Sequence, residues 1–136
     1  MQTLRAHGVQ TLLVSGGFTR FTEPVAAMIG FDAALANVLE TDGGHLTGRV
    51  MPPIVGAAAK ADALTGKAAE IGASLAETIA IGDGANDLKM VTAAGFGIAY
   101  HAKPKLAEAA DARIRRGELT ALLHAVGIPV ADWVAD

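Results

Sequence analysis

The chain has 136 residues, with 11 Lys and Arg against 14 Asp and Glu, so its formal net charge is −3. Hydrophobic residues make up 51% and charged residues only 18%, which excludes an intrinsically disordered chain and predicts a single small domain over residues 1–136. The acidic balance and the lack of a Lys/Arg run argue against nucleic acid or an anionic membrane as a partner. Cysteine is absent, which excludes disulfides, cysteine-ligated zinc and thiol nucleophiles. Because no apolar stretch has the length of a membrane span or a signal peptide, we expect a soluble cytoplasmic protein.

Apolar runs alternate with turn formers along the chain, which predicts an α/β domain with a mostly parallel sheet and flanking helices. In chain order, the pattern predicts a helix over 1–7, a strand over 9–14, a helix over 19–29 that ends at Gly30, and an irregular stretch over 31–53. A helix over 56–71, a strand over 78–81, a helix over 88–94 and a strand over 96–100 follow. The last predicted elements are a helix over 104–110, a short strand over 113–115 and a helix over 118–126. Within the irregular stretch, Asp42-Gly43-Gly44 predicts a β-hairpin that leaves the main sheet. The pattern does not place the tail 129–136.

The first polar loop, Ser15-Gly16-Gly17, lies between a predicted buried strand and a predicted helix. In a parallel sheet, ligands bind beyond the carboxyl ends of the strands. A hydroxyl, free backbone amides and the positive end of a helix dipole together favour a phosphate or another oxyanion. An ordinary tight turn with Ser15 as a local cap is the alternative.

The second polar loop, Gly82-Asp-Gly-Ala-Asn-Asp87, places the carboxylates of Asp83 and Asp87 beside Asn86 at the end of another strand. Such oxygens suit Mg²⁺, which takes one or two carboxylates and completes its shell with water and substrate phosphate. A glycine-rich turn with an Asn or Asp helix cap is the alternative.

Lys60 is one of the few charges in an Ala-rich helix, and taken alone it is a candidate surface lysine. Four isolated histidines show no metal-ligand spacing and are interpreted as structural or surface residues: His7, His45, His101 and His124.

Together, these residues resemble the haloacid dehalogenase superfamily of phosphotransferases and, within it, the phosphoserine phosphatase family. Leu13-Val-Ser-Gly-Gly-Phe18 is similar to the family's second motif, Lys60 stands where its third-motif lysine is expected, and Ile81-Gly-Asp-Gly-Ala-Asn-Asp87 matches its fourth. Ala36-Asn37 and Ala102-Lys103-Pro104 are similar to intervening segments. The resemblance implies a Rossmann-like core and covers roughly residues 4–126.

The resemblance also implies roles for the phosphate side of the site. Ser15 and the Gly16 amide would hold the phosphoryl oxygens, and Lys60 would pair with the nucleophilic carboxylate and the phosphate. A lysine and backbone amides neutralise the charge that phosphoryl transfer places on the equatorial oxygens.

The remaining implied roles concern the metal and the substrate. Asp83 would ligate Mg²⁺, Asp87 would act through a metal-bound water and a contact to Lys60, and Asn86 would hydrogen-bond the phosphate or the substrate. The implied reaction is the Mg²⁺-dependent hydrolysis of O-phospho-L-serine, a small phosphomonoester, to L-serine and phosphate in serine biosynthesis.

The sequence departs from this family at the first motif, DxDx[TV], which supplies the phosphorylated aspartate and the acid/base. No Asp-x-Asp occurs in the chain, and none of its eight aspartates precedes the Ser-Gly-Gly loop: Asp32, Asp42, Asp62, Asp83, Asp87, Asp111, Asp132 and Asp136. The family's helical cap and its central nucleophile strand are also missing. We therefore expect the C-terminal part of a phosphoserine phosphatase, inactive alone, whose partner is the missing N-terminal part of the parent chain or a second copy. The alternatives are another small-molecule phosphatase of the superfamily and a non-catalytic phosphate- or metal-binding module.

Overall fold

The computed structural model describes residues 1–134, and the chain forms two compact units. Unit 1 comprises residues 1–55 and the C-terminal segment from Leu123, and unit 2 comprises Gly56–Leu122. Each unit carries its own three-stranded sheet and is described by itself. The prediction of one domain over residues 1–136 stays a prediction.

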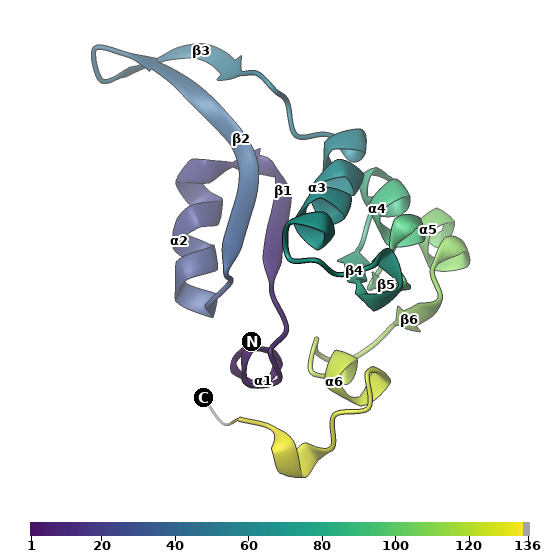
Figure 1. The fold of residues 1–136 in the computed structure, drawn as a ribbon. Helices are drawn as coiled ribbons and strands as arrows, with labels where there is room; N and C mark the ends of the chain where they lie inside the picture. Colours follow the sequence, from purple (N-terminus) through teal and green to yellow (C-terminus); the bar gives the residue numbers. More distant parts are fainter. Residues whose placement is uncertain (135–136) are drawn as a thin grey trace. The chain divides into compact units, whose positions relative to one another are not determined.

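Unit 1 is an α/β layer in which α2 packs beside β1 and β2 (Figure 1). Its elements are α1 (Gln2–Ala6), β1 (Leu12–Phe18), α2 (Thr19–Ile29), β2 (Ala33–Asp42), β3 (His45–Met51) and the 3₁₀ turn η3 (Val130–Asp132). The helix predicted over 19–29 is confirmed at both ends. It ends at Gly30, whose φ of 88° is the left-handed conformation that closes many helices.

Strand β1 differs from the prediction, because it begins at Leu12 and continues through the Ser-Gly-Gly loop to Phe18. It pairs in parallel with β2, and the register is interrupted between Val14 and Phe18. At the start of this pair, Thr11 donates from both its amide and its hydroxyl to the Asp32 carboxylate, at 2.8 and 2.7 Å. The loop is therefore a bulge within a strand.

The hairpin around Asp42-Gly43-Gly44 is confirmed, since β2 and β3 pair antiparallel on either side of it. Gly43 and Gly44 have φ values of +54° and +82°, the left-handed conformation that a two-residue hairpin turn requires. The prediction of an irregular stretch before the hairpin is wrong. Residues 33–37 of β2 form the parallel pair with β1, and only the rest of β2 belongs to the hairpin, which projects from unit 1 (Figure 1).

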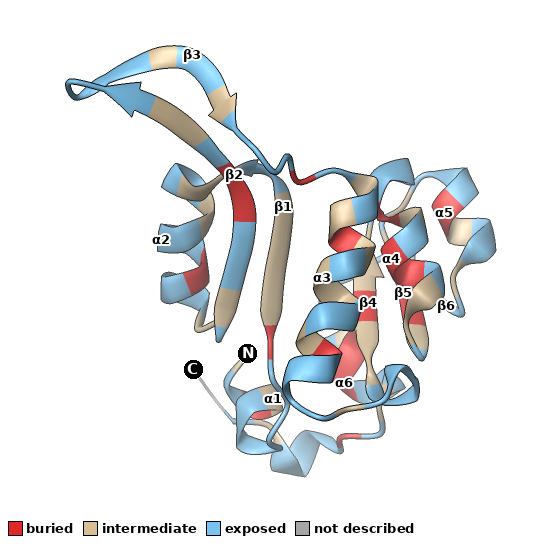
Figure 2. Ribbon diagram, turned by 45° about the horizontal axis from the view of Figure 1, so that its top comes forward, coloured by how far each residue is buried: buried red, intermediate tan, exposed pale blue. Residues whose placement is uncertain are grey.

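Unit 2 is a parallel sheet in the order β4-β5-β6 with helices packed against it. Its elements are α3 (Ala57–Glu70), η1 (Leu75–Glu77), β4 (Ile79–Gly82), η2 (Ala85–Asp87), α4 (Leu88–Ala93), β5 (Phe96–Tyr100), α5 (Pro104–Ala109) and β6 (Ala112–Ile114). The bounds of the helices and strands agree with the predicted elements to within one residue, whereas the 3₁₀ turns η1 and η2 were not predicted. The core gathers on β4, α4, β5 and α5 (Figure 2), and its buried cluster is Ala80, Met90, Val91, Ala99 and Leu106.

The last helix, α6 (Ala121–Ala125), is shorter than the predicted 118–126. Beyond it, the Trp133 indole donates to the Ile128 carbonyl at 3.2 Å and its ring lies 4.9 Å from that of His124. This places the part of the tail that the sequence left unassigned, while residues 135 and 136 lie outside the described residues. Over residues 1–134, no helix combines the length and the apolar character needed to span a bilayer.

Candidate functional site

A buried ion pair forms the base of the candidate site in unit 2. Lys60 on α3 is 7% exposed and Asp87 at the end of η2 is 5% exposed. The Lys60 Nζ lies 2.6 Å from the Asp87 Oδ1. The contact between these two residues, implied by the family resemblance, is therefore present, and Lys60 is not a surface lysine.

The loop after β4 folds so that the Asp87 carboxylate caps its own backbone. Its second oxygen, Oδ2, accepts hydrogen bonds from the amides of Asp83 and Gly84 at 3.1 and 3.2 Å. Gly82 makes this possible, since a Cβ there would lie only 2.8 Å from the Asp87 Cγ. The glycine at the end of β4 is thus required by the close approach of the Asp87 side chain.

The charge state of Asp87 follows from these contacts. Burial alone would raise the pKa of the carboxyl, but the hydrogen bond from Lys60, those from the amides of Gly84 and Asp83, and the charge of Lys60 outweigh it and hold the pKa below its ordinary value. Asp87 is therefore an anion whose two oxygens both accept hydrogen bonds, one from Lys60 and the other from two backbone amides.

Asp83 has the opposite environment, because its side chain is exposed and, within residues 1–134, accepts no hydrogen bond and forms no ion pair. Its backbone is fixed on both sides: its amide donates to Asp87, and its carbonyl accepts from the Lys103 amide at 3.0 Å. An exposed carboxylate on a backbone held in this way fits one ligand position of Mg²⁺. Across the described chain, no three His, Asp or Glu side chains gather into a complete metal site.

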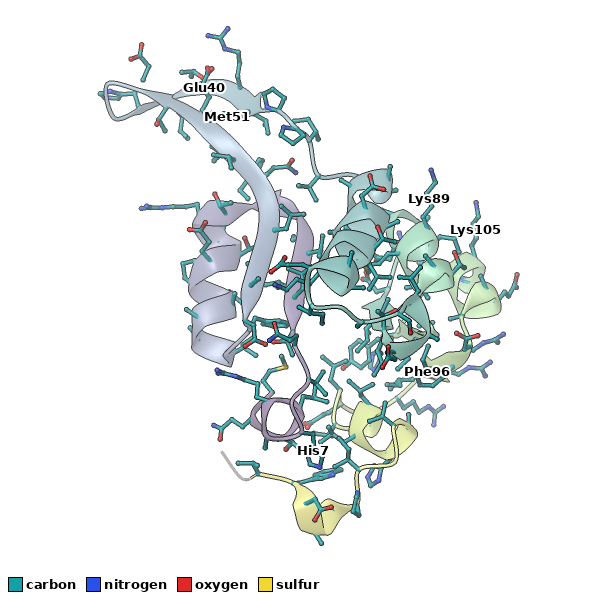
Figure 3. All side chains as sticks on the ribbon, in the orientation of Figure 1. His7, Glu40, Met51, Lys89, Phe96 and Lys105 are labelled. Atoms are coloured by element: carbon teal, nitrogen blue, oxygen red, sulfur yellow. The ribbon has the colours of Figure 1, made fainter. Side chains whose placement is uncertain are left out.

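Asn86 lies between the two aspartates on the exposed side of the loop. No hydrogen bond of its side chain occurs within the described part of the chain, so its amide is available to an external group. Other lysines of unit 2 are unlike Lys60: Lys89 on α4 and Lys105 on α5 point outward and are exposed (Figure 3). Burial thus singles out Lys60.

Ser15 and Gly16, the other predicted phosphate-binding residues, lie in the bulge of β1 in unit 1. The Ser15 hydroxyl accepts a hydrogen bond from the Gly17 amide at 3.0 Å, and both glycines are exposed. The candidate residues therefore form two groups, one in each unit. Unit 2 brings together Lys60, Asp83, Asn86 and Asp87, and unit 1 brings together Ser15 and Gly16.

Sequence reasoning missed the role of Asn37, which is 6% exposed and lies on β2. Its Nδ2 donates to the Gly16 carbonyl at 2.9 Å and its Oδ1 accepts from the Val55 amide at 2.7 Å. The only signal in the sequence was the similarity of Ala36-Asn37 to a family segment, which does not indicate what the side chain contacts.

Comparison with known proteins places these motifs in a family. The model of the haloacid dehalogenase-like hydrolases matches residues 1–92. The chain is 45% identical over 141 aligned positions to the phosphoserine phosphatase of Streptomyces coelicolor, which covers 100% of this chain and 34% of that protein. It is also 45% identical to phosphoserine phosphatase SerB2 of Mycobacterium tuberculosis, over 94% of this chain and 31% of that protein.

Solved structures agree with this assignment. The crystal structure of a probable phosphoserine phosphatase from Vibrio cholerae superposes with a TM-score of 0.88 at 39% identity, covering 95% of this chain and 40% of that one. The chain therefore spans about a third of the length of the curated relatives described above.

Proposed function

This chain belongs to the haloacid dehalogenase-like hydrolases, and from that premise we propose that it forms part of a phosphoserine phosphatase. This part supplies the lysine of the site and binds the metal and the phosphate. The observation that carries the proposal is the buried Lys60–Asp87 pair next to the exposed Asp83 carboxylate, which has no partner among the described residues. The identity to relatives named phosphoserine phosphatase supports O-phospho-L-serine as the substrate.

Each residue has a task in this proposal. Lys60 is held by Asp87 as a fixed positive charge that attracts the phosphoryl oxygens. The Gly16 amide and the Ser15 hydroxyl donate hydrogen bonds to phosphoryl oxygens, and Asn86 orients the phosphate or the serine portion. Asp83 would hold Mg²⁺, which supplies charge neutralisation at the phosphoryl group when bound.

The attacking carboxylate is absent from the sequence, which contains no Asp-x-Asp. We propose that it comes from a further segment of a parent chain or from a second copy. That segment would add a strand at a free sheet edge, that of β1 in unit 1 or that of β4 in unit 2.

The test is a chimera in which residues 1–136 replace the aligned region of the Streptomyces coelicolor relative. We expect the chimera to release phosphate from phosphoserine in the presence of Mg²⁺, and the isolated chain to release none. A chimera that folds but hydrolyses neither phosphoserine nor other small phosphomonoesters would favour a non-catalytic binding module. Turnover by the isolated chain would contradict the assignment of the nucleophile to another segment.

A further inference from the structure

The Ser-Gly-Gly bulge has an unusual geometry within its strand pair. The register pairs Val14 with Leu35 and next pairs Phe18 with Asn37, so β1 advances four residues while β2 advances two. Ser15, Gly16 and Gly17 have no partner in this register. A bulge of this kind loses the ladder hydrogen bonds that would otherwise fix its peptide groups.

The peptide group between Gly16 and Gly17 is nevertheless held at both ends. Its carbonyl accepts a hydrogen bond from the Asn37 Nδ2 at 2.9 Å, and its N–H donates to the Ser15 Oγ at 3.0 Å. Because a peptide group is planar, two hydrogen bonds on opposite sides set its orientation. The orientation of the Asn37 amide is itself determined, since Oδ1 accepts from the Val55 N–H, which can only donate.

This arrangement decides which hydrogen-bond donors face outward. The Ser15 oxygen already accepts from the Gly17 amide, so its own proton is free to be donated to an external acceptor. The Gly16 N–H lies in the exposed bulge without a register partner on β2. The Ser15 hydroxyl is bonded to the peptide group that Asn37 holds, and the Gly16 N–H belongs to the peptide group directly before it.

We infer that Asn37 is a positioning residue for the phosphate, acting through the Gly16–Gly17 peptide to aim the Gly16 amide and the Ser15 hydroxyl. This inference rests on the proposed function, because it concerns the same phosphate-binding loop. Asn37 is buried on β2, and its side chain bonds to the backbone groups of Gly16 and Val55. The competing explanation is that Asn37 only stabilises the bulge.

The experiment compares two ends of the same strand pair in the chimera. Asn37→Asp keeps the shape and the acceptor for Val55 but loses the donor to Gly16. Asn37→Ala loses the hydrogen bonds to both Gly16 and Val55 without adding a charge. It replaces Asn37→Asp in the experiment if that variant does not fold. The control is Thr11→Val, which removes the buried hydroxyl bond to Asp32 at the other end of the pair.

The readouts are the inhibition constant of inorganic phosphate, kcat and KM for phosphoserine, the unfolding midpoint, and the ¹⁵N-glycine amide spectrum during phosphate titration. We expect the Asn37 variants to raise the inhibition constant about 10-fold and to lower kcat/KM by about 10- to 100-fold, since small displacements of positioning groups have such effects. Phosphate should shift the Gly16 amide in the parent and in Thr11→Val, and shift it much less in the Asn37 variants.

The outcomes separate the two proposals. One outcome is that the Asn37 variants lose as much stability as Thr11→Val while the inhibition constant of phosphate stays unchanged. That result would overturn the positioning role and leave the proposed function intact. A parent chimera that neither binds phosphate nor hydrolyses phosphoserine would overturn both. Weakened phosphate binding in the Asn37 variants alone supports the inference.

Discussion

The Nζ of Lys60 lies 2.6 Å from the Oδ1 of Asp87, and both side chains are buried. The pair joins the helix α3 to the loop that follows β4, because the other oxygen of the same carboxylate holds two amides of that loop. A charge at this place is tolerated only while its partner is present, since an unpaired buried charge is strongly unfavourable. Stability and the proposed phosphate binding would therefore depend on the same contact.

Replacing Lys60 by Ala should leave the Asp87 carboxylate buried without a cation. We expect the free energy of unfolding to fall by about 3–5 kcal/mol, the usual effect of breaking a buried pair from one side. Activity of the chimera should also be nearly abolished, because the phosphoryl charge is no longer neutralised. Urea unfolding and phosphate release measure the two effects.

The double variant Lys60→Met with Asp87→Leu is the matched control for this prediction. It removes both charges and fills the space with apolar side chains, which is often neutral for stability. We expect it to recover only part of the lost stability, because the amides of Asp83 and Gly84 lose their acceptor, and none of the activity. Near-normal turnover in Lys60→Ala would contradict the role of the lysine at the phosphoryl group, and a loss of stability below about 1 kcal/mol would contradict the stabilising role of the pair.

The lowered pKa of Asp87 predicts how stability changes with pH. The pKa in the folded chain lies below the ordinary value of 3.8, so the unfolded chain takes up the proton first as the pH falls. The stabilisation is complete above the ordinary pKa and is lost as the pH falls through the lowered one. Urea unfolding between neutral pH and about pH 3 should show this acid loss.

Asp87→Asn isolates this effect from other carboxyls. Glu77 also has a lowered pKa, because the backbone amide and the hydroxyl of Ser74 donate to it, and it contributes to the pH dependence of both proteins. The difference between parent and variant removes that common contribution. Identical pH dependence in both would argue against Asp87 as the group that titrates.

Gly82 should not tolerate a side chain. In Gly82→Ala the new Cβ would meet the Asp87 side chain, which is fixed by Lys60 and two amides and cannot retreat. We expect a loss of roughly 1–3 kcal/mol in unfolding free energy, as for other overpacked sites, together with reduced activity of the chimera. Differential scanning calorimetry and phosphate release measure these losses.

Gly66→Ala is the matched control for Gly82→Ala, because it adds the same methyl group at a position with open space. Gly66 lies within α3, and no atom lies within 4 Å of the position its Cβ would take. Alanine should stabilise the helix there by about 0.5–1 kcal/mol. If Gly82→Ala were also stabilising, the close approach of Asp87 would not be the reason for glycine at that position.

The extent to which the sequence predicts this structure depends on the range of the interactions involved. Helix α2 was predictable from Thr19 to Ile29 because its end is set locally by Gly30. Strand β1 was not, because its continuation to Phe18 depends on Asn37, 21 residues after Gly16. For the same reason β2 was taken for an irregular stretch, since its parallel pairing is non-local.

The candidate site shows a similar division. The residue types at Lys60, Asp83 and Asp87 were recognisable from motifs, and their resemblance to a family implied the contact between Lys60 and Asp87. Residue patterns alone left Lys60 a surface lysine, because burial is decided by the packing of α3 with the loop after β4. The role of Gly82 was hidden as well, since it depends on how Asp87 folds back.

Asp83→Asn tests the proposed metal ligand without a large effect on folding. The side chain is exposed and unpartnered among the described residues, so we expect the unfolding free energy to change by less than about 0.5 kcal/mol. Activity of the chimera should nearly vanish, because a carboxylate ligand is lost. Asp62→Asn on the exposed side of α3 carries the same change of charge and should leave activity intact. Near-normal turnover in Asp83→Asn would contradict the assignment.

Magnesium affinity of the isolated chain should be weak, since Asp83 offers one carboxylate and the Asp87 oxygens are engaged. Isothermal calorimetry with Mg²⁺ alone measures it. The chimera should bind Mg²⁺ more tightly than the isolated chain, and Asp83→Asn should remove that difference. Tight binding by the isolated chain would mean that a complete site exists within it.

The free sheet edges carry the final prediction. Strand β1 pairs with β2 on one side, and β4 pairs with β5 on one side, so each presents the backbone groups of its other side. Each buried hydrogen bond left unmade costs about 1–3 kcal/mol. If added strands cover these edges in the functional protein, the amides of 12–14 and 79–81 that point to the free side should exchange hydrogen about 10- to 100-fold more slowly in the chimera than in the dilute isolated chain. Protection of the isolated chain that rises with its concentration would identify a second copy as the covering partner. An isolated monomer that protects both edges as strongly as the chimera would show that no added strand is needed.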